Sequence, residues 1–251
     1  MLGLSATVTR KDGHHPIIFM QCGPVRYRVD AKKQAGVRLF DHKVIFRRTE
    51  FRLSHRPDEK PSIQELYANL AQDPARNDLI FDDILSTLEE GRSPIVITER
   101  KDHVAMLAGR LSKFARNVIV LQGGMGARLS RTAREALEAI PDSEERVLIA
   151  TGRYLGEGFD DARLDTLFLT MPISWRGTLS QYAGRLHRQH TSKRDVVIYD
   201  YVDENEPVLM KMARRREAGY RSLGYRAALA GEFDLIRSTP GERSTALASR
   251  L

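Results

Sequence analysis

Five short and nearly uninterrupted runs of apolar residues constrain the fold of this chain more than any other feature of its sequence. The runs cover residues 95–98, 118–121, 147–150, 167–170 and 196–201. A strand that is apolar at almost every position must be covered on both faces, as in a parallel sheet between two layers of helices. Helical patterns fill the gaps at residues 102–114, 128–139 and 178–188. This alternation predicts an α/β domain, a doubly wound parallel sheet with helices on both faces.

The composition limits the class of protein and its compartment. The 251 residues suffice for one substantial domain with additions, and 41% hydrophobic with 29% charged residues is typical of a soluble globular protein. No apolar run approaches the roughly 20 residues that span a bilayer, and no signal peptide is evident, so we expect a cytoplasmic protein that contacts no membrane. Cys22 is the only cysteine, which excludes an internal disulfide and a cysteine-rich zinc site. The net charge of +7 favours a polyanionic partner.

The predicted helix at residues 178–188 divides into two faces. An apolar stripe at helical spacing consists of Leu179, Tyr182, Ala183 and Leu186. A second stripe, about 200° around the helix, consists of Gln181, Gly184, Arg185 and Arg188. Thr178 is the expected N-cap. Two guanidiniums that point the same way suit phosphate oxygens, although a surface helix with solvated arginines explains the same pattern.

Polar or glycine-containing turns follow three of the predicted strands. They are residues 98–100, 123–126 and 151–153, and they include Arg100, Gly124 and Thr151. In open α/β sheets, ligands bind beyond the carboxyl ends of the strands, where free backbone N–H groups at a helix start can hold a phosphate. Each turn can equally be an ordinary connection. Two adjacent histidines, His14 and His15, point in different directions, so we expect no metal site.

Three segments resemble motifs of superfamily 2 helicases and translocases, in the order that the family has them. QYAGRLHR, ending at Arg188, resembles the Q-x-x-G-R-x-x-R signature of motif VI. ATGRYLGEGFD at residues 150–160 resembles motif V, and LGLSATVTRKDG near the start resembles motif III. The resemblance implies that the predicted sheet is the C-terminal RecA-like domain of a DEAD/DEAH-type helicase.

The resemblance also implies roles for individual residues. Arg185 and Arg188 would stabilise charge on the γ-phosphate of ATP, and Gln181, Gly158 and Asp160 would contact the nucleotide. Arg100, in the place of motif IV, and Thr151 would contact the nucleic-acid backbone, and Gly124 is a further candidate by its place at a strand end. Ser5 and Thr7 would couple the nucleotide state to the movement of the two domains.

The features that hold ATP in this family are absent from the sequence. There is no G-x-x-x-x-G-K-[ST] phosphate loop and no Asp-Glu pair after an apolar strand to hold Mg²⁺. GGMGARLS at residues 123–130 lacks the lysine of a phosphate loop. We therefore expect the C-terminal half of a motor, in which ATP and Mg²⁺ are bound mainly by a first RecA-like domain, neither is held tightly by this chain, and the chain alone does not hydrolyse ATP.

The expected organisation has three parts. Residues 1–56 would be a remnant of the first RecA-like domain and the interdomain connection, with a loop around RKDGHHP, a short strand in GPVRYRV at 23–29 and a β-like bridge from residue 31. Residues 57–225 would form the second RecA-like domain, and residues 226–251 a tail that frays after Phe233.

A second function class stays open. The basic surface also suits a non-catalytic module that binds nucleic acid or protein, and the helix at 210–226, with Tyr220 and Tyr225 among arginines, suits either single strands or a solvated face. A small-molecule α/β enzyme is disfavoured because no nucleophile–base pair is evident. The sequence does not distinguish DNA from RNA, or unwinding from translocation.

Overall fold

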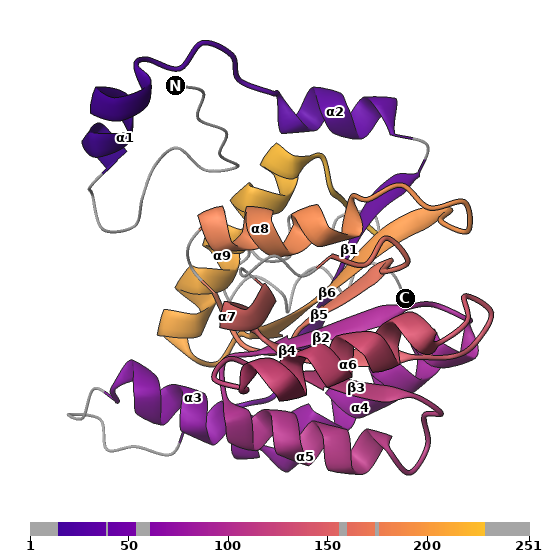
Figure 1. Ribbon diagram of the computed structural model, residues 1–251. Helices are drawn as coiled ribbons and strands as arrows, with labels where there is room; N and C mark the ends of the chain where they lie inside the picture. Colours follow the sequence, from indigo (N-terminus) through magenta and orange to yellow (C-terminus); the bar gives the residue numbers. More distant parts are fainter. Residues whose placement is uncertain (1–14, 39, 54–60, 156–159, 174–175, 229–251) are drawn as a thin grey trace, which may run out of the picture.

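The described residues form a single seven-stranded sheet in which all neighbouring strands are parallel (Figure 1). The computed structural model describes residues 15–38, 40–53, 61–155, 160–173 and 176–228. The strands are β1 (Asp41–Thr49), β2 (Pro94–Thr98), β3 (Val118–Leu121), β4 (Val147–Thr151), β5 (Thr166–Leu169), β6 (Asp195–Asp203) and β7 (Arg226–Ala227). Their order across the sheet is β3-β4-β2-β5-β6-β1-β7. The predicted fold class is confirmed.

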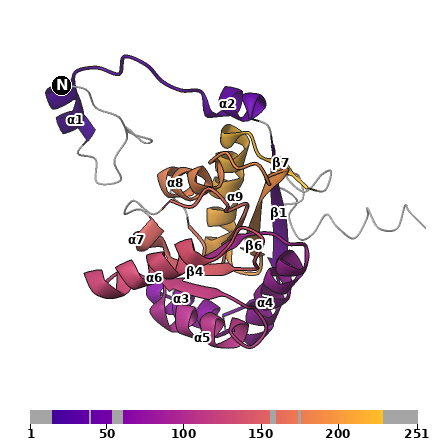
Figure 2. The ribbon, with the colours of Figure 1, turned by 45° about the vertical axis from the view of Figure 1, so that its right-hand side comes forward.

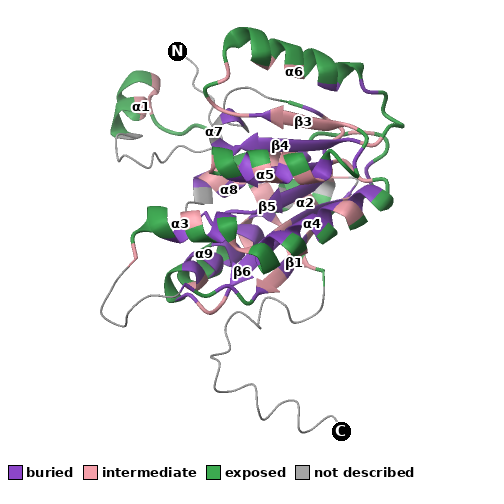
Figure 3. Ribbon diagram, turned by 90° about the horizontal axis from the view of Figure 1, so that it is seen from below, coloured by how far each residue is buried: buried purple, intermediate pink, exposed green. Residues whose placement is uncertain are grey.

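Helices cover both faces of the sheet (Figures 1 and 3). One layer consists of α4 (Pro74–Glu89) and α5 (Lys101–Leu111), and the other of α6 (Ala127–Ala139), α8 (Arg176–Leu186) and α9 (Pro207–Leu223). The shorter α7 (Gly152–Leu155) follows β4, and α3 (Ile63–Gln72) precedes α4. Two further helices, α1 (His15–Cys22) and α2 (Ala31–Val37), precede β1. Among the described helices, none is long and apolar enough to cross a membrane.

The strands are apolar at successive positions because alternate side chains enter different cores. In β4, Leu148 and Ala150 pack with α6, α8 and α9, whereas Val147 and Ile149 pack with α4 and α5. All four are fully buried. At roughly 25 cal/mol per Å² of apolar surface removed from water, these two cores are the main stabilising contribution to the sheet.

Local signals in the sequence explain where several helices begin and end. The Ser62 hydroxyl accepts a hydrogen bond from the Glu65 amide (3.2 Å) and caps α3. Asp73 caps α4 in the same way, with Pro74 in its first turn. Gly224, with a φ of 85°, ends α9 in the left-handed conformation, and a Cβ there would overlap Ala35 of α2.

The sheet extends beyond the expected boundaries of the second domain. β1 was expected in a bridge between two domains, but it pairs with β6 over its whole length, from Asp41 opposite Asp195 to Thr49 opposite Asp203. The Thr49 hydroxyl donates to the Asp203 carboxylate at 2.6 Å in the interior. β7, within the expected tail, pairs with β1. The stretch was expected to be β-like, but its basic residues Lys43, Arg47 and Arg48 gave no indication that it joins this sheet.

The segment before β1 also differs from expectation. Residues 15–22, of which the first two belong to the loop expected around RKDGHHP, form α1, and residues 24–30, expected to include a strand, have no strand partner among the described residues. Several apolar side chains in this segment are exposed, including Ile17, Met20 (82%) and Tyr27 (83%). Figure 2 shows α1 standing away from the sheet and its helices. Ser5 and Thr7 lie outside the described residues.

Candidate functional site

Most of the predicted site residues that the structure describes lie at two opposite edges of the sheet, whereas Gln181 and Arg185 lie within α8. The carboxyl edge, where strands end, comprises residues 98–101, 122–126 and 151–152. The amino edge, where strands begin, comprises residues 140–146, 160–165 and 186–194. Motif V is divided between them, because Thr151 ends β4 and Asp160 lies on the return to the start of β5.

Hydrogen bonds from side chains to neighbouring turns organise the carboxyl edge. The Gly123 amide donates to the Thr151 hydroxyl oxygen (2.8 Å), which joins the turn after β3 to the end of β4. The Thr98 hydroxyl is hydrogen-bonded to Nδ1 of His103 (2.9 Å), whose Nε2 is bonded to Asn77 (3.0 Å). Burial lowers the pKa of His103 to about 3, with a smaller contribution from Arg76, so this imidazole is neutral at pH 7. These bonds fix the geometry of the loops.

Gly152 is required at the carboxyl edge by a close approach. A Cβ at this position would overlap the Tyr182 hydroxyl and the Glu99 carboxylate. The Tyr182 hydroxyl, from α8, donates to Glu99 Oε1 at 3.2 Å. Burial, together with the Glu99 charge, raises the pKa of Tyr182. Helix α8 is thereby attached to the loops that follow β2 and β4.

Cations and a left-handed glycine lie on the exposed side of this edge. Arg100 forms an ion pair with Asp102 (2.7 Å), and Gly124 has a φ of 84°. The Lys101 ammonium lies 3.5 Å from the position of a Cβ on Gly124, so it faces the turn after β3. Lys101 was not among the predicted site residues, although the basic pair Arg100-Lys101, one residue after an apolar strand, was a usable signal.

The two faces predicted for α8 are present in the structure. Leu179, Tyr182, Ala183 and Leu186 are buried, and Gln181 is exposed. The bounds differ: α8 starts at Arg176, so Thr178 is inside the helix and is not its N-cap, and it ends at Leu186, so Arg188 lies beyond it. Arg185 is half-buried in the last turn.

At the amino edge, Arg188 contacts Asp160, a residue predicted to bind the nucleotide. Its Nε donates to Asp160 Oδ1 at 3.0 Å, and both side chains are about half exposed (58% and 45%). This contact brings the candidate residues of motif VI and motif V together. Gly158, the other motif V candidate for the nucleotide, lies outside the described residues.

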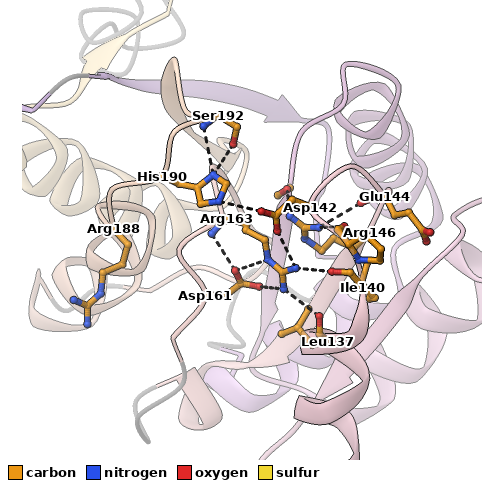
Figure 4. A network of polar contacts seen from close by, with 12 residues as sticks. Leu137, Ile140, Asp142, Glu144, Arg146, Asp161, Arg163, Arg188, His190 and Ser192 are labelled. Carbon is orange, nitrogen blue, oxygen red and sulfur yellow. Dashed lines mark hydrogen bonds and ion pairs between the residues drawn. The ribbon is translucent and has the colours of Figure 1, made fainter.

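A network of charged side chains supports the loop that carries Asp160 (Figure 4). The Arg163 guanidinium pairs with Asp161 (2.9 Å) and donates to the carbonyl oxygens of Leu137 (3.1 Å) and Ile140 (2.8 Å) at the end of α6. Asp142, which approaches both Arg163 and His190, extends the network. In Figure 4, Arg188 points away from this network. Arg163 was not predicted as a site residue, since a single arginine in a loop has no distinguishing pattern.

Comparisons with known proteins agree with the predicted resemblance. The putative ATP-dependent RNA helicase L396 of Acanthamoeba polyphaga mimivirus is 22% identical over 228 residues, covering 90% of this chain and 42% of that protein. The transcript termination protein A18 of Yaba-like disease virus is 29% identical over 132 residues, covering 51% of this chain and 27% of that protein. The chain therefore spans less than half of the length of either curated relative. No protein-family model matches it.

Two solved structures show the same fold. T4 UvsW superposes with a TM-score of 0.57 at 17% identity, over 75% of this chain and 41% of that chain. S. cerevisiae Dbp5 bound to RNA and ADP BeF3 superposes with a TM-score of 0.55 at 14% identity, over 93% of this chain and 52% of that chain. The chain thus has the fold of the C-terminal RecA-like domain of superfamily 2 helicases, and the resemblance predicted from its motifs is confirmed.

Proposed function

We propose that this chain supplies the C-terminal half of an ATP-dependent nucleic-acid helicase or translocase. The observation that carries the proposal is the contact between Arg188 and Asp160, which places a guanidinium and a carboxylate from two helicase-like motifs on one exposed surface. The relatives support the same role, because the mimivirus protein is named a putative ATP-dependent RNA helicase.

At the amino edge, Arg188 acts on ATP that a first RecA-like domain holds. An exposed ion pair such as Arg188–Asp160 contributes only about 0–1 kcal/mol to stability, so the guanidinium can exchange the carboxylate for a phosphate at little cost. An arginine that reaches the γ-phosphate stabilises the charge of the transition state. Arg185 assists from the last turn of α8, and Gln181, Gly158 and Asp160 contact the nucleotide.

At the carboxyl edge, the chain contacts the phosphate backbone of DNA or RNA. Arg100 and Lys101 supply positive charge there, and Gly124 and Thr151 lie in turns whose backbone can approach a phosphate closely. Backbone contacts of this kind are independent of base sequence.

The first RecA-like domain is the proposed protein partner. Val25, Tyr27 and Val29 alternate with Arg26 and Arg28, which is the pattern of a strand with one apolar face, and all five side chains are exposed. We assign α1 and these residues to the surface that joins the first domain, and residues 41–227 to the second. ATP and Mg²⁺ are bound mainly by the first domain.

A chimera tests this function. The present chain replaces the aligned region of the mimivirus helicase relative, and ATP hydrolysis is measured with and without single-stranded RNA and DNA. We expect nucleic-acid-stimulated hydrolysis by the chimera and none by the present chain alone, because the sequence lacks a phosphate loop. Nucleic-acid binding without hydrolysis in the chimera would instead favour the non-catalytic binding module.

A further inference from the structure

Lys193 lies in the turn before β6, and its side chain reaches back to the end of α8. The ammonium donates to the carbonyl oxygen of Leu186 (2.8 Å), the last residue of α8, and to that of Arg188 (2.8 Å). The residue is buried, with 8% of its surface exposed, and its Nζ lies 5.8 Å from the centre of the Phe40 ring. A single side chain therefore holds the main chain on both sides of His187.

The end of a helix is a favourable place for a buried cation. The last carbonyls of an α-helix have no partner within the helix, and the helix dipole makes this end negative. A buried ammonium is costly unless its donors are satisfied, and these two carbonyls satisfy two of the three. Burial lowers the pKa of Lys193 to about 8, while Asp165, Asp161 and Asp160 act in the opposite direction. The cation still predominates at pH 7.

The Arg188 side chain cannot fix its own position. It is more than half exposed, and its partner Asp160 is also exposed, so this ion pair contributes little to holding the guanidinium in place. Arg188 also lies outside the regular hydrogen bonding of α8. The direction of its side chain is consequently set by the main chain from Leu186 to Arg188, which is where Lys193 binds.

We propose that Lys193 is a positioning residue for Arg188. Its ammonium closes the end of α8 and holds the turn that presents the guanidinium toward Asp160. The counterpart on the other side is Arg163, which ties the loop of Asp160 to the end of α6. Lys193 and Arg163, which both bind main-chain carbonyls, thus fix the two segments that carry Arg188 and Asp160.

Amide hydrogen exchange in the present chain tests the positioning role without any assumption about ATP. The His187 amide donates to the Gly184 carbonyl (3.2 Å), so its exchange reports on the closed turn. In Lys193→Met, which keeps the length and loses the charge, we expect this amide to exchange at least about tenfold faster, while Val197 in β6 keeps its protection. Lys193→Arg, which keeps a cation, should recover most of the protection.

The matched control is Lys43→Met. Lys43 is a cation at the same edge, but it pairs with Asp195 (2.6 Å) and does not bind α8. This control variant should leave the His187 amide unchanged. An unchanged His187 amide in Lys193→Met, or equal loss in Lys193→Arg, would overturn the proposal. If Lys193→Met does not fold, the unmodified chain decides: the Lys193 ammonium protons should exchange far more slowly than those of Lys43, and equal rates would overturn the proposal.

The consequence for hydrolysis rests on the proposed function and is measured separately. In the chimera, Lys193→Met should lower kcat by about 10²-fold and leave KM nearly unchanged, since a small displacement of a catalytic group affects mainly the transition state. Faster His187 exchange in Lys193→Met, recovered in Lys193→Arg, together with a chimera that hydrolyses no ATP would keep the positioning role and reject the function. An unchanged His187 amide in Lys193→Met, together with an unmodified chimera that hydrolyses ATP, would keep the function and reject the positioning role.

Discussion

The two edges of the sheet are built in different ways. At the carboxyl edge, the geometry depends on turns and neutral donors: the Gly123 amide on the Thr151 hydroxyl, the left-handed Gly124 and the close approach of the Tyr182 hydroxyl to Gly152. At the amino edge, it depends on side-chain charges, with Arg163 and Lys193 bound to carbonyl oxygens behind the Arg188–Asp160 pair. A surface of turns and amides suits a repetitive ligand such as a nucleic-acid backbone, whereas one positioned guanidinium suits one phosphate.

Helix α8 connects the two edges. Tyr182 attaches its buried face to Glu99 at the carboxyl edge, and its last turn leads to Arg188 at the amino edge. Because the two edges are separate, we expect changes at the carboxyl edge to alter nucleic-acid binding and changes at the amino edge to alter hydrolysis.

The largest effect is expected from Arg188→Ala in the chimera. Hydrolysis should fall by roughly 10³- to 10⁵-fold, because an arginine finger stabilises charge that develops in the transition state. Nucleotide affinity should stay within about tenfold of that of the unmodified chimera. Single-turnover hydrolysis and nucleotide titration measure the two quantities, and affinity for single strands should not change.

Arg188→Lys is the matched variant. A lysine keeps the charge but lacks the planar fork, so it should restore little of the rate. Near-normal turnover in Arg188→Ala would mean that the amino edge is an ordinary solvated surface.

We expect acidic pH to lower the free energy of unfolding, because histidines at both edges are held neutral in the folded chain. Burial lowers the pKa of His187 to about 3 and of His42 to about 4 at the amino edge, and that of His103 to about 3 at the carboxyl edge. Because the unfolded chain takes up these protons near pH 6.5, the stability that the neutral rings contribute is full above pH 6.5 and is lost as the pH falls toward 3. As the pH falls from 6.5 to 5, each of these histidines should reduce the free energy of unfolding by roughly 2 kcal/mol.

Urea unfolding at pH 7.5 and pH 5 measures this loss. His103→Gln and His187→Gln should each reduce the pH dependence, and their effects should add because the two rings belong to different edges. A free energy of unfolding that does not change between these pH values would contradict the assigned neutral state.

Nucleic-acid binding by the present chain should weaken with salt. If the carboxyl edge makes about three phosphate contacts on a duplex, affinity should drop ~40-fold between 50 and 200 mM salt, following a slope of about −0.9 per contact. Lys101→Ala should reduce that slope by roughly one contact, whereas Lys43→Ala, at the amino edge, should leave it unchanged. Fluorescence anisotropy at several salt concentrations measures the slope, and equal effects of the two lysines would mean that binding is not confined to the carboxyl edge.

The last prediction concerns the local effect of Gly152→Ala on stability. The added methyl overlaps the Tyr182 hydroxyl, so we expect a loss of about 1–3 kcal/mol in the free energy of unfolding. Adding Tyr182→Phe to this variant removes the hydroxyl and should recover part of the lost free energy of unfolding. Gly109→Ala, where no atom lies within 4 Å of the new Cβ, is the control and should be neutral or stabilising. A neutral Gly152→Ala would show that Tyr182 and Glu99 are not held against this loop.

The sequence predicted the sheet well because its strands are buried on both faces. The short runs of Val, Leu and Ile in β2, β3, β4 and β5 favour strands covered on both faces, and each predicted strand lies within one or two residues of the observed one. β1 was harder to place, because Lys43, Arg47 and Arg48 interrupt its apolar residues and its position beside β6 depends on tertiary pairing.

The site residues were less predictable, since their roles depend on contacts between segments that are distant in the sequence. The stripes of α8 were readable from spacing alone, but the end of the helix at Leu186 was not, because the cap comes from Lys193, seven residues further along. Similarly, nothing local in motif V indicated that Thr151 and Asp160 lie at opposite edges. That follows only from the topology, because β4 ends at Thr151 and Asp160 precedes the start of β5, which runs in the same direction.

The separation of the two edges is tested most directly by mapping a bound single strand on the chain. Amide and arginine Nε resonances of the isotope-labelled chain would be recorded during titration with a short oligonucleotide at low salt. We expect shifts confined to the carboxyl edge, in residues 98–101, 122–126 and 151–152, with the Arg188 Nε resonance unchanged. Shifts centred on Arg188 and residues 160–163, with the loops after β2, β3 and β4 unaffected, would contradict the separation.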